Sequence, residues 1–161
     1  MSELDEAGPR GRLVLVTAAR ADARAALASA VAARLQRAVV VDGAALEAAV
    51  TSGVVPGWDE PPTSDQLRTR LLRWSAALAV AETYQLEGLD AVVAEEALGD
   101  RLEDFLDLVE PEPIHVVVVR DGADPATPHW GLWVGGTDPV DATAEDVVTR
   151  LADALVATSA T

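Results

Sequence analysis

The segment RLVLVTAARADARAAL (residues 12–27) runs from apolar residues through a short turn into an alanine-rich stretch. Its first part is typical of a strand that is covered on both faces of a sheet. Leu27, Val31 and Leu35 recur every four residues, which predicts a helix after the turn. A strand, a turn and a helix in this order form the layout of a phosphate-binding loop, so the residues of the turn determine what it can hold.

The remaining apolar runs repeat this alternation of strand and helix. Strands are predicted at residues 12–16, 38–41, 89–95, 114–119 and 131–134. Helical patterns are formed by Leu46 with Val50, and by Leu67, Leu71, Trp74, Leu78 and Ala81 in one long helix. Right-handed crossovers between such units give a three-layer α/β fold, in which helices flank a five-stranded, mostly parallel sheet.

Capping signals mark the ends of two helices. Thr63 or Ser64 is the predicted N-cap of the long helix, and Gly88 is its predicted end. A capping box from Thr143 to Asp146 predicts the start of the last helix.

Length and charge limit the classes of function. The chain has 161 residues and no internal repeat, so we expect a flexible tail at residues 1–11 and a single domain at 12–161. The net charge of −15 would repel nucleic acid and anionic membrane surfaces. No apolar run reaches the roughly 18 residues of a membrane span, and the first twelve residues are polar. We therefore expect a cytoplasmic protein without nucleic-acid or membrane partners.

Missing residue types exclude several kinds of chemistry. The chain has no cysteine and only two histidines, which excludes disulfides and metal sites built from cysteine or from several histidines. All twelve basic residues are arginine, so mechanisms that require a lysine are excluded as well.

The turns that follow the first three predicted strands are the places to look for a ligand site. Four stretches carry a likeness to known proteins: VLVTAARADARAALASAVAARL, VVVDGAALEAAVTSG, SDQLRTRLLRWSAALAVAETYQLEGLDAVVAEEAL and GLWVGGTDPVDATAEDVVTRL. In layout and hydrophobic pattern the chain resembles the small P-loop kinases, within them the chloramphenicol phosphotransferase-like and zeta-toxin-like group, over residues 12–157. The resemblance implies a P-loop NTPase-like fold.

The phosphate loop of that family, G-x-x-x-x-G-K-[ST], falls on AARADARA. Ala18 and Ala23 stand at the glycines, Arg24 at the lysine and Ala25 at the metal-binding hydroxyl. Glycines matter there because the loop must bend and bring its N–H groups within reach of the phosphates. Ala25 cannot ligate magnesium.

The resemblance therefore implies a degenerate phosphate loop that includes Thr17 and residues 22–25. Asp22 would add repulsion beside a polyphosphate. Arg24 has two interpretations: a surviving phosphate ligand, or a solvated arginine in the first turn of a helix.

Two acids could still serve catalysis. Asp42 follows the second strand, where related phosphotransferases place the base that deprotonates the substrate hydroxyl; the alternative is an ordinary turn or cap residue. Glu95 ends the third strand, where a Walker-B-like acid could hold magnesium through water.

Contacts with a substrate or partner are expected from loops. The candidates are Trp58, Gln66, Arg120, His129 and Trp130. The loop around Trp58 either frames a pocket or covers the sheet edge, and His129 beside Trp130 either faces a partner or packs locally. The segment RDGADPATPHWG, where such kinases carry lid arginines, holds Arg120 alone.

The acidic stretch EEALGDRLEDFLDLVEPE (residues 95–112) predicts an amphipathic helix. Its apolar side consists of Leu98, Leu102, Phe105, Leu106 and Val109. The acids then form a solvated face; the alternative is a surface for a basic protein.

Two functions fit these residues. The preferred hypothesis is a degenerate P-loop kinase-like protein, without phosphoryl transfer and without a nucleotide cofactor, that binds a protein or a small molecule. The alternative is an ATP- or GTP-dependent phosphotransferase acting with magnesium on a small hydroxylated substrate, with Asp42 as base, Arg24 on phosphate and Glu95 assisting the metal. Alanine-rich helices pack closely, so the sequence also permits a homodimer.

Overall fold

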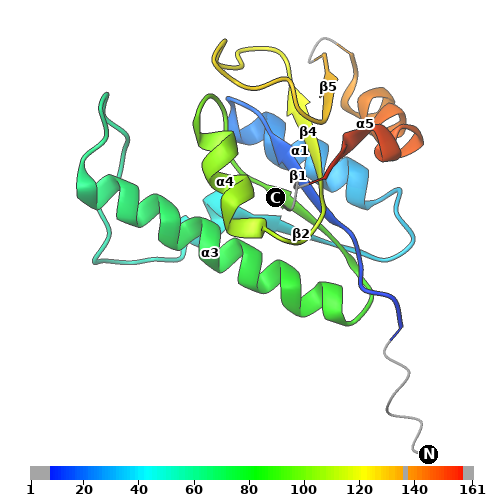
Figure 1. Cartoon of the computed structure of the whole chain (residues 1–161), viewed down its shortest axis with the longest axis horizontal. Helices are drawn as coiled ribbons and strands as arrows, with labels where there is room; N and C mark the ends of the chain where they lie inside the picture. Colours follow the sequence, from blue (N-terminus) through cyan, green and yellow to red (C-terminus); the bar gives the residue numbers. More distant parts are fainter. Residues whose placement is uncertain (1–7, 136–137, 158–161) are drawn as a thin grey trace, which may run out of the picture.

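The computed structural model describes residues 8–135 and 138–157. In chain order the elements are β1 (Leu13–Thr17), α1 (Ala21–Ala32), β2 (Ala38–Asp42), α2 (Gly43–Ala48), α3 (Ser64–Leu86), β3 (Asp90–Ala94), α4 (Arg101–Val109), β4 (Ile114–Val119), β5 (Leu132–Val134), α5 (Val140–Thr149), a 3₁₀ turn η1 (Leu151–Ala154) and β6 (Leu155–Val156). Figure 1 shows the sheet in the middle of the molecule, with α3 along one side and α1 and α5 on another.

The sheet has the predicted parallel core. Its strands lie in the order β2-β3-β1-β4-β5, and each neighbouring pair is parallel. All five strands expected from the apolar runs are present. β6 pairs antiparallel with β4 and was not predicted, because two residues are too few for a periodic signal.

Successive strand residues point to opposite faces, and this divides the core into two layers. Leu13, Leu15 and Val93 belong to the layer under α3 and α4, together with Trp74 and Phe105. The opposite layer contains Val14, Val16 and Val92 and packs against α1 and α5. The sheet is therefore covered on both faces, which explains why its strands are continuous apolar runs.

The long helix α3 begins and ends where the sequence indicates. Thr63 is its N-cap and forms a complete capping box with Gln66. Gly88 follows the helix with a φ of 83°, a conformation that favours glycine.

The capping box predicted from Thr143 to Asp146 is wrong. The helix α5 begins one turn earlier, at Val140 after Pro139, and the Thr143 N–H donates to the Pro139 carbonyl at 3.1 Å. Pro139 is the N-cap residue and no side chain caps the helix, so the side chain of Thr143 does not mark its start.

Two predicted core positions of α3 are exposed. Trp74 and Ala81 are buried against the sheet, whereas Leu67 and Leu71 are 45% and 46% exposed. Both leucines lie in the part of α3 that extends beyond the sheet and lines a pocket. In α1 the predicted helical pattern also runs too far, because the helix ends at Ala32 and Leu35 lies after it.

The predicted tail at residues 1–11 stays a prediction, and its first seven residues lie outside the described part of the chain. At Gly11 the N–H donates to the Gln85 carbonyl at 2.9 Å, so the chain contacts α3 before β1 begins. None of the helices within the described ranges is both long and apolar enough to span a membrane.

Candidate functional site

The connection from β1 to α1 is much shorter than a phosphate loop. Only residues 18–20 separate the strand from the helix, so Ala23 and Arg24 lie inside the first helical turn. Among the described residues, no non-glycine residue has a positive φ. The chain therefore turns directly into α1 without the bent conformations that a phosphate loop requires from its glycines.

Arg24 is a buried residue of this turn. It is only 5% exposed, which excludes the interpretation as a solvated arginine. Its Nη1 donates to the carbonyl oxygens of Ala18 at 2.8 Å and Ala19 at 3.4 Å, and lies 3.9 Å from Glu96 Oε2. The guanidinium thus occupies the hollow of the turn and is bound to the backbone from inside.

The N-terminus of α1 carries an acidic side chain. Asp22 Oδ1 accepts a hydrogen bond from the Ala23 N–H at 3.0 Å, and the Arg20 guanidinium pairs with the same carboxylate. These hydrogen bonds lower the pKa of Asp22, and the hydrogen bond from Arg20 has the largest effect. A negative charge therefore already lies where the helix N-terminus would attract a phosphate.

Thr17 also faces inward. It is fully buried, and its Oγ1 accepts a hydrogen bond from the Ala97 N–H at 2.9 Å. A polyphosphate at this turn would meet the carbonyls held by Arg24, the carboxylate of Asp22 and the methyl group of Ala25. The residues of this turn therefore do not fit a bound nucleoside triphosphate.

Asp42 lies at the carboxyl end of β2, as expected, and is the N-cap of α2. Its Oδ1 accepts a hydrogen bond from the Ala44 N–H at 3.0 Å. This is the cap arrangement that the sequence left open as the alternative to a catalytic base.

Glu95 is engaged in a buried ion pair. It is fully buried, and Arg73 donates to its carboxylate through Nε, 2.9 Å from Oε2, and through Nη2. Arg73 also pairs with Glu47. Burial alone would lower the pKa of Arg73, but hydrogen bonds to Glu95 and Glu47 outweigh it, so the pKa is raised.

This ion pair is packed against Gly43. A Cβ at Gly43 would overlap the Glu95 carboxylate, with Cδ at 2.6 Å, and would lie 3.0 Å from Arg73 Nε. A magnesium ion at Glu95 would have to displace Arg73. No set of three histidine or acidic side chains suited to a metal ion occurs in the described ranges.

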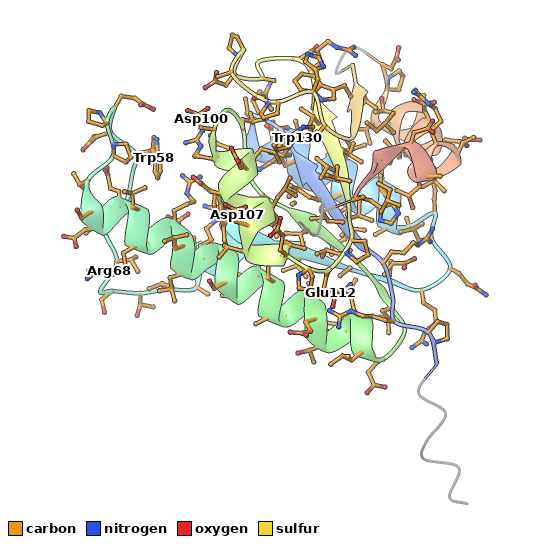
Figure 2. The ribbon with its side chains drawn as sticks, in the orientation of Figure 1. Trp58, Arg68, Asp100, Asp107, Glu112 and Trp130 are labelled. Carbon is orange, nitrogen blue, oxygen red and sulfur yellow. The ribbon has the colours of Figure 1, made fainter. Side chains whose placement is uncertain are left out.

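A pocket of about 310 Å³ lies between the loop that precedes α3, α3 itself and the start of α4. Trp58 lies on the loop and Asp100 at the start of α4 (Figure 2). The guanidinium carbons of Arg70 and Arg101 lie 4.8 and 4.9 Å from the centre of the Trp58 ring, within the range of cation–π attraction. The loop around Trp58 therefore frames a pocket, one of the two arrangements that the sequence left open.

The charges of the pocket are mixed. Arg70 is partly buried, and this burial is the main reason why its pKa is lowered. Arg101 donates to Glu96 Oε1 at 3.1 Å, so Glu96 joins this pocket to Arg24 in the neighbouring turn. The acidic residues of the lining are Glu60, Asp100, Asp104 and Asp124.

Trp74 adds a donor without an acceptor. It lines the pocket, is 2% exposed, and its Nε1 is a buried polar atom with no hydrogen-bond partner. Most buried polar groups in proteins are hydrogen-bonded, so this indole N–H is an exception; its ring packs edge-on against Phe105, with ring centres 5.3 Å apart.

The other candidate residues do not gather at this pocket. Gln66 is buried, and its Oε1 accepts hydrogen bonds from the N–H groups of Thr63 and Asp59, so it holds the loop in place. Arg120 lines a separate pocket near α5. His129 stacks on Trp133, with ring centres 4.1 Å apart, while Trp130 lines a third pocket beside α4.

The helix α4 (Arg101–Val109) is shorter than the acidic stretch at residues 95–112 that predicted it. All five apolar residues of its predicted inner side are buried, although Leu98 precedes the helix. The acidic residues of α4 itself are exposed, as predicted, whereas Glu95 at the start of the stretch is buried. Figure 2 shows Asp107 of this outer face.

Sequence reasoning missed the three arginines that organise the site: Arg70, Arg73 and Arg101. Arg70 and Arg73 follow the capping box of α3 by one and two turns, and Arg101 begins α4. An arginine that falls among the apolar positions of a long helix signals a buried partner, and Arg73 directly precedes the buried Trp74.

Solved structures with a similar fold include kinases. The APS kinase CysC of Mycobacterium tuberculosis matches with a TM-score of 0.69 at 17% identity, over 90% of this chain and 99% of that one. The same enzyme in complex with AMPPNP and APS matches with a TM-score of 0.68 at 16% identity, over 90% and 99%. A gluconokinase from Sinorhizobium meliloti 1021 matches with a TM-score of 0.58 at 16% identity, over 90% and 94%.

These similarities confirm the predicted α/β fold of the P-loop kinases. No protein-family model matches the chain. No curated protein matches its sequence significantly either.

Proposed function

We propose that this chain is a kinase-like protein that does not transfer phosphoryl groups and instead binds a ligand in the pocket beside Trp58. The observation that carries the proposal is the position of Arg24. Its buried guanidinium is bound to the carbonyls of Ala18 and Ala19, in the turn where a kinase would hold its nucleotide phosphates. A nucleotide would have to expel a buried cation and then face the carboxylate of Asp22.

The pocket supports a small polar ligand. Arg70 and Arg101 offer guanidinium donors for an acidic group. The four carboxylates of the lining would accept hydrogen bonds from hydroxyl or ammonium groups of the same molecule. We propose a small molecule that carries one acidic group together with hydroxyl or amino groups.

The phosphotransferase remains the second candidate, since Asp42 lies opposite Ala94 in the pairing of β2 with β3 and so lies near Glu95. Two acids at the carboxyl ends of neighbouring strands are what that reaction would need. In this function Asp42 would leave its capping bond, and Glu95 would exchange Arg73 for magnesium. For either function we propose that the chain is related to the chloramphenicol phosphotransferase-like and zeta-toxin-like group, on the basis of its layout.

Calorimetric titration with ATP and GTP, each with and without magnesium, separates the two functions. We expect no heat of binding up to millimolar nucleotide. Micromolar binding that requires magnesium, and that is lost in Arg24→Ala but kept in Arg120→Ala, would overturn the proposal. Circular dichroism of both variants checks that each is folded.

The ligand site is tested by thermal shift and tryptophan fluorescence with a panel of hydroxy acids, amino acids and their uncharged amides. We expect an acid to raise the melting temperature of the wild type while its amide has little effect, because the amide lacks the charge that the arginines recognise. The response should be lost in Arg101→Gln and kept in Arg120→Gln. A response that persists in Arg101→Gln would exclude this pocket.

A further inference from the structure

The outer side of α3 is an exposed apolar surface. Four large residues of this helix point to solvent beyond the pocket: Leu72 (59% exposed), Val80 (36%), Tyr84 (42%) and Leu86 (59%). Between them lie the small exposed residues Ser75, Ala76 and Ala79. Figure 1 shows α3 along the outside of the molecule, with the sheet on its other side. Leu72, Ala76 and Ala79 follow one another at helical spacing and form one apolar stripe, and exposed apolar surface of this kind commonly marks an interaction site.

This surface also lacks charge. Between Leu71 and Glu82 the helix has a single charged residue, Arg73, and its side chain is turned inward to Glu95 and Glu47. A chain with a net charge of −15 would ordinarily place charges on an exposed helix face. The face is therefore suited to burial against another protein surface.

The two halves of the face complement each other. The first half carries a positive charge at Arg68, before Leu72, and the second half carries a negative charge at Glu82, after Ala79. Arg68 has no hydrogen bond or ion pair with any described residue, and Figure 2 shows it pointing away from the body of the molecule. Glu82 is 59% exposed and has a contact of 3.6 Å with Arg10.

We propose that a second copy of this chain covers the face, in an antiparallel contact of α3 with α3 around a two-fold axis near Ser75 and Ala76. Such an axis places Leu72 opposite the partner's Ala79. It brings Arg68 beside the partner's Glu82. A large residue thus meets a small one and opposite charges meet for the same position of the axis, as an isologous interface requires.

A groove next to the axis provides room for a side chain. It measures about 60 Å³ and lies between α2 and α3, where Leu46, Val50 and Val54 form an apolar wall beside Leu72 and Ala76. A leucine of the partner would fill it and remove further apolar surface from water.

Cysteine cross-linking tests the contact directly, because the chain has no cysteine of its own. We expect Ser75→Cys to form a covalent dimer under mild oxidation. Ser29→Cys, on the exposed side of α1 across the sheet, is the matched control and should stay monomeric on a denaturing gel. A cross-link that forms equally in both variants, or in neither, would overturn the proposal.

Charge exchange supplies a second, independent test by analytical ultracentrifugation. Arg68→Glu and Glu82→Arg should each raise the dissociation constant of the dimer about tenfold or more, because each places like charges together across the axis. The double variant should restore association toward the wild type. A wild type that stays monomeric at high micromolar concentration refutes this arrangement. A dimer whose dissociation constant is unchanged by both single variants refutes it as well, because such a dimer forms through another surface.

Discussion

Arg24 Nη1 lies 2.8 Å from the carbonyl oxygen of Ala18, although a nucleotide-binding loop would turn its lysine outward to the phosphates. The donor therefore stabilises the turn that it belongs to. With the ion pair of 3.9 Å to Glu96, it also joins the start of α1 to the end of β3. The residue that occupies the catalytic position of the sequence motif is a structural brace.

We expect Arg24→Ala to lower the free energy of unfolding by about 1–3 kcal/mol, because it leaves buried carbonyls without donors. Arg20→Ala is the matched control in the same turn. Its side chain is 77% exposed, and its loss should change stability by less than about 1 kcal/mol. Urea unfolding followed by tryptophan fluorescence measures both. Equal effects of the two changes would contradict the buried role of Arg24.

The contact between Gly43 and Glu95 predicts that even one methyl group is not tolerated. Gly43→Ala would push the Glu95 carboxylate away from Arg73, and we expect a loss of about 1–3 kcal/mol of stability. Gly8→Ala is the control, because no atom lies within 4 Å of its Cβ position. Thermal unfolding of the two variants should differ clearly; an unchanged melting temperature for Gly43→Ala would mean that the ion pair can shift without cost.

The buried pair of Arg73 and Glu95 predicts a non-additive double variant. Arg73→Met leaves a buried carboxylate unpaired, which costs about 3–5 kcal/mol in comparable pairs. Adding Glu95→Met removes that charge, so the double variant should be more stable than Arg73→Met alone. Denaturant unfolding of the wild type, both single variants and the double variant gives the coupling. If the double variant is the least stable of the four proteins, the unpaired carboxylate of Glu95 does not cause the loss of stability in Arg73→Met.

The sheet could be predicted from the sequence because burial on both faces leaves a mark on consecutive residues. β1 and β4 are nearly continuous apolar runs, and parallel strands of this kind allow few topologies. Local signals failed where two of them competed, as at Pro139 and Thr143, or where a helix extends beyond the sheet, as at Leu67.

The site was harder to predict because its contacts join residues far apart in the chain. Arg73 and Glu95 are 22 positions apart, and only the packing of α3 on β3 brings them together. Asp42 and Glu95 were placed correctly at the ends of their strands, but sequence alone could not show that each already has a partner. The direction of the Arg24 side chain likewise depends on the length of the turn.

His115 predicts how stability depends on pH. It lies in β4, partly buried, with Nδ1 3.3 Å from the Leu13 carbonyl oxygen. Burial lowers the pKa of His115 most strongly, and the charge of Arg12 lowers it further, against smaller opposing effects of the Leu13 carbonyl and Asp90. The folded state therefore stays neutral at a pH where the unfolded histidine, with a pKa of about 6.5, already binds a proton.

The stabilisation associated with neutral His115 is fully present above about pH 6.5 and is lost as the pH falls, because only the unfolded state gains the proton. The free energy of unfolding should decrease by up to about 1.4 kcal/mol per pH unit in that range. In His115→Gln, which keeps a donor for the Leu13 carbonyl, the decrease between about pH 7 and 5 should be smaller than in the wild type. Urea unfolding of both proteins across this range, with their difference at about pH 8 as the baseline, measures the effect. Parallel curves for the two proteins would show that the histidine titrates alike in the folded and unfolded chains.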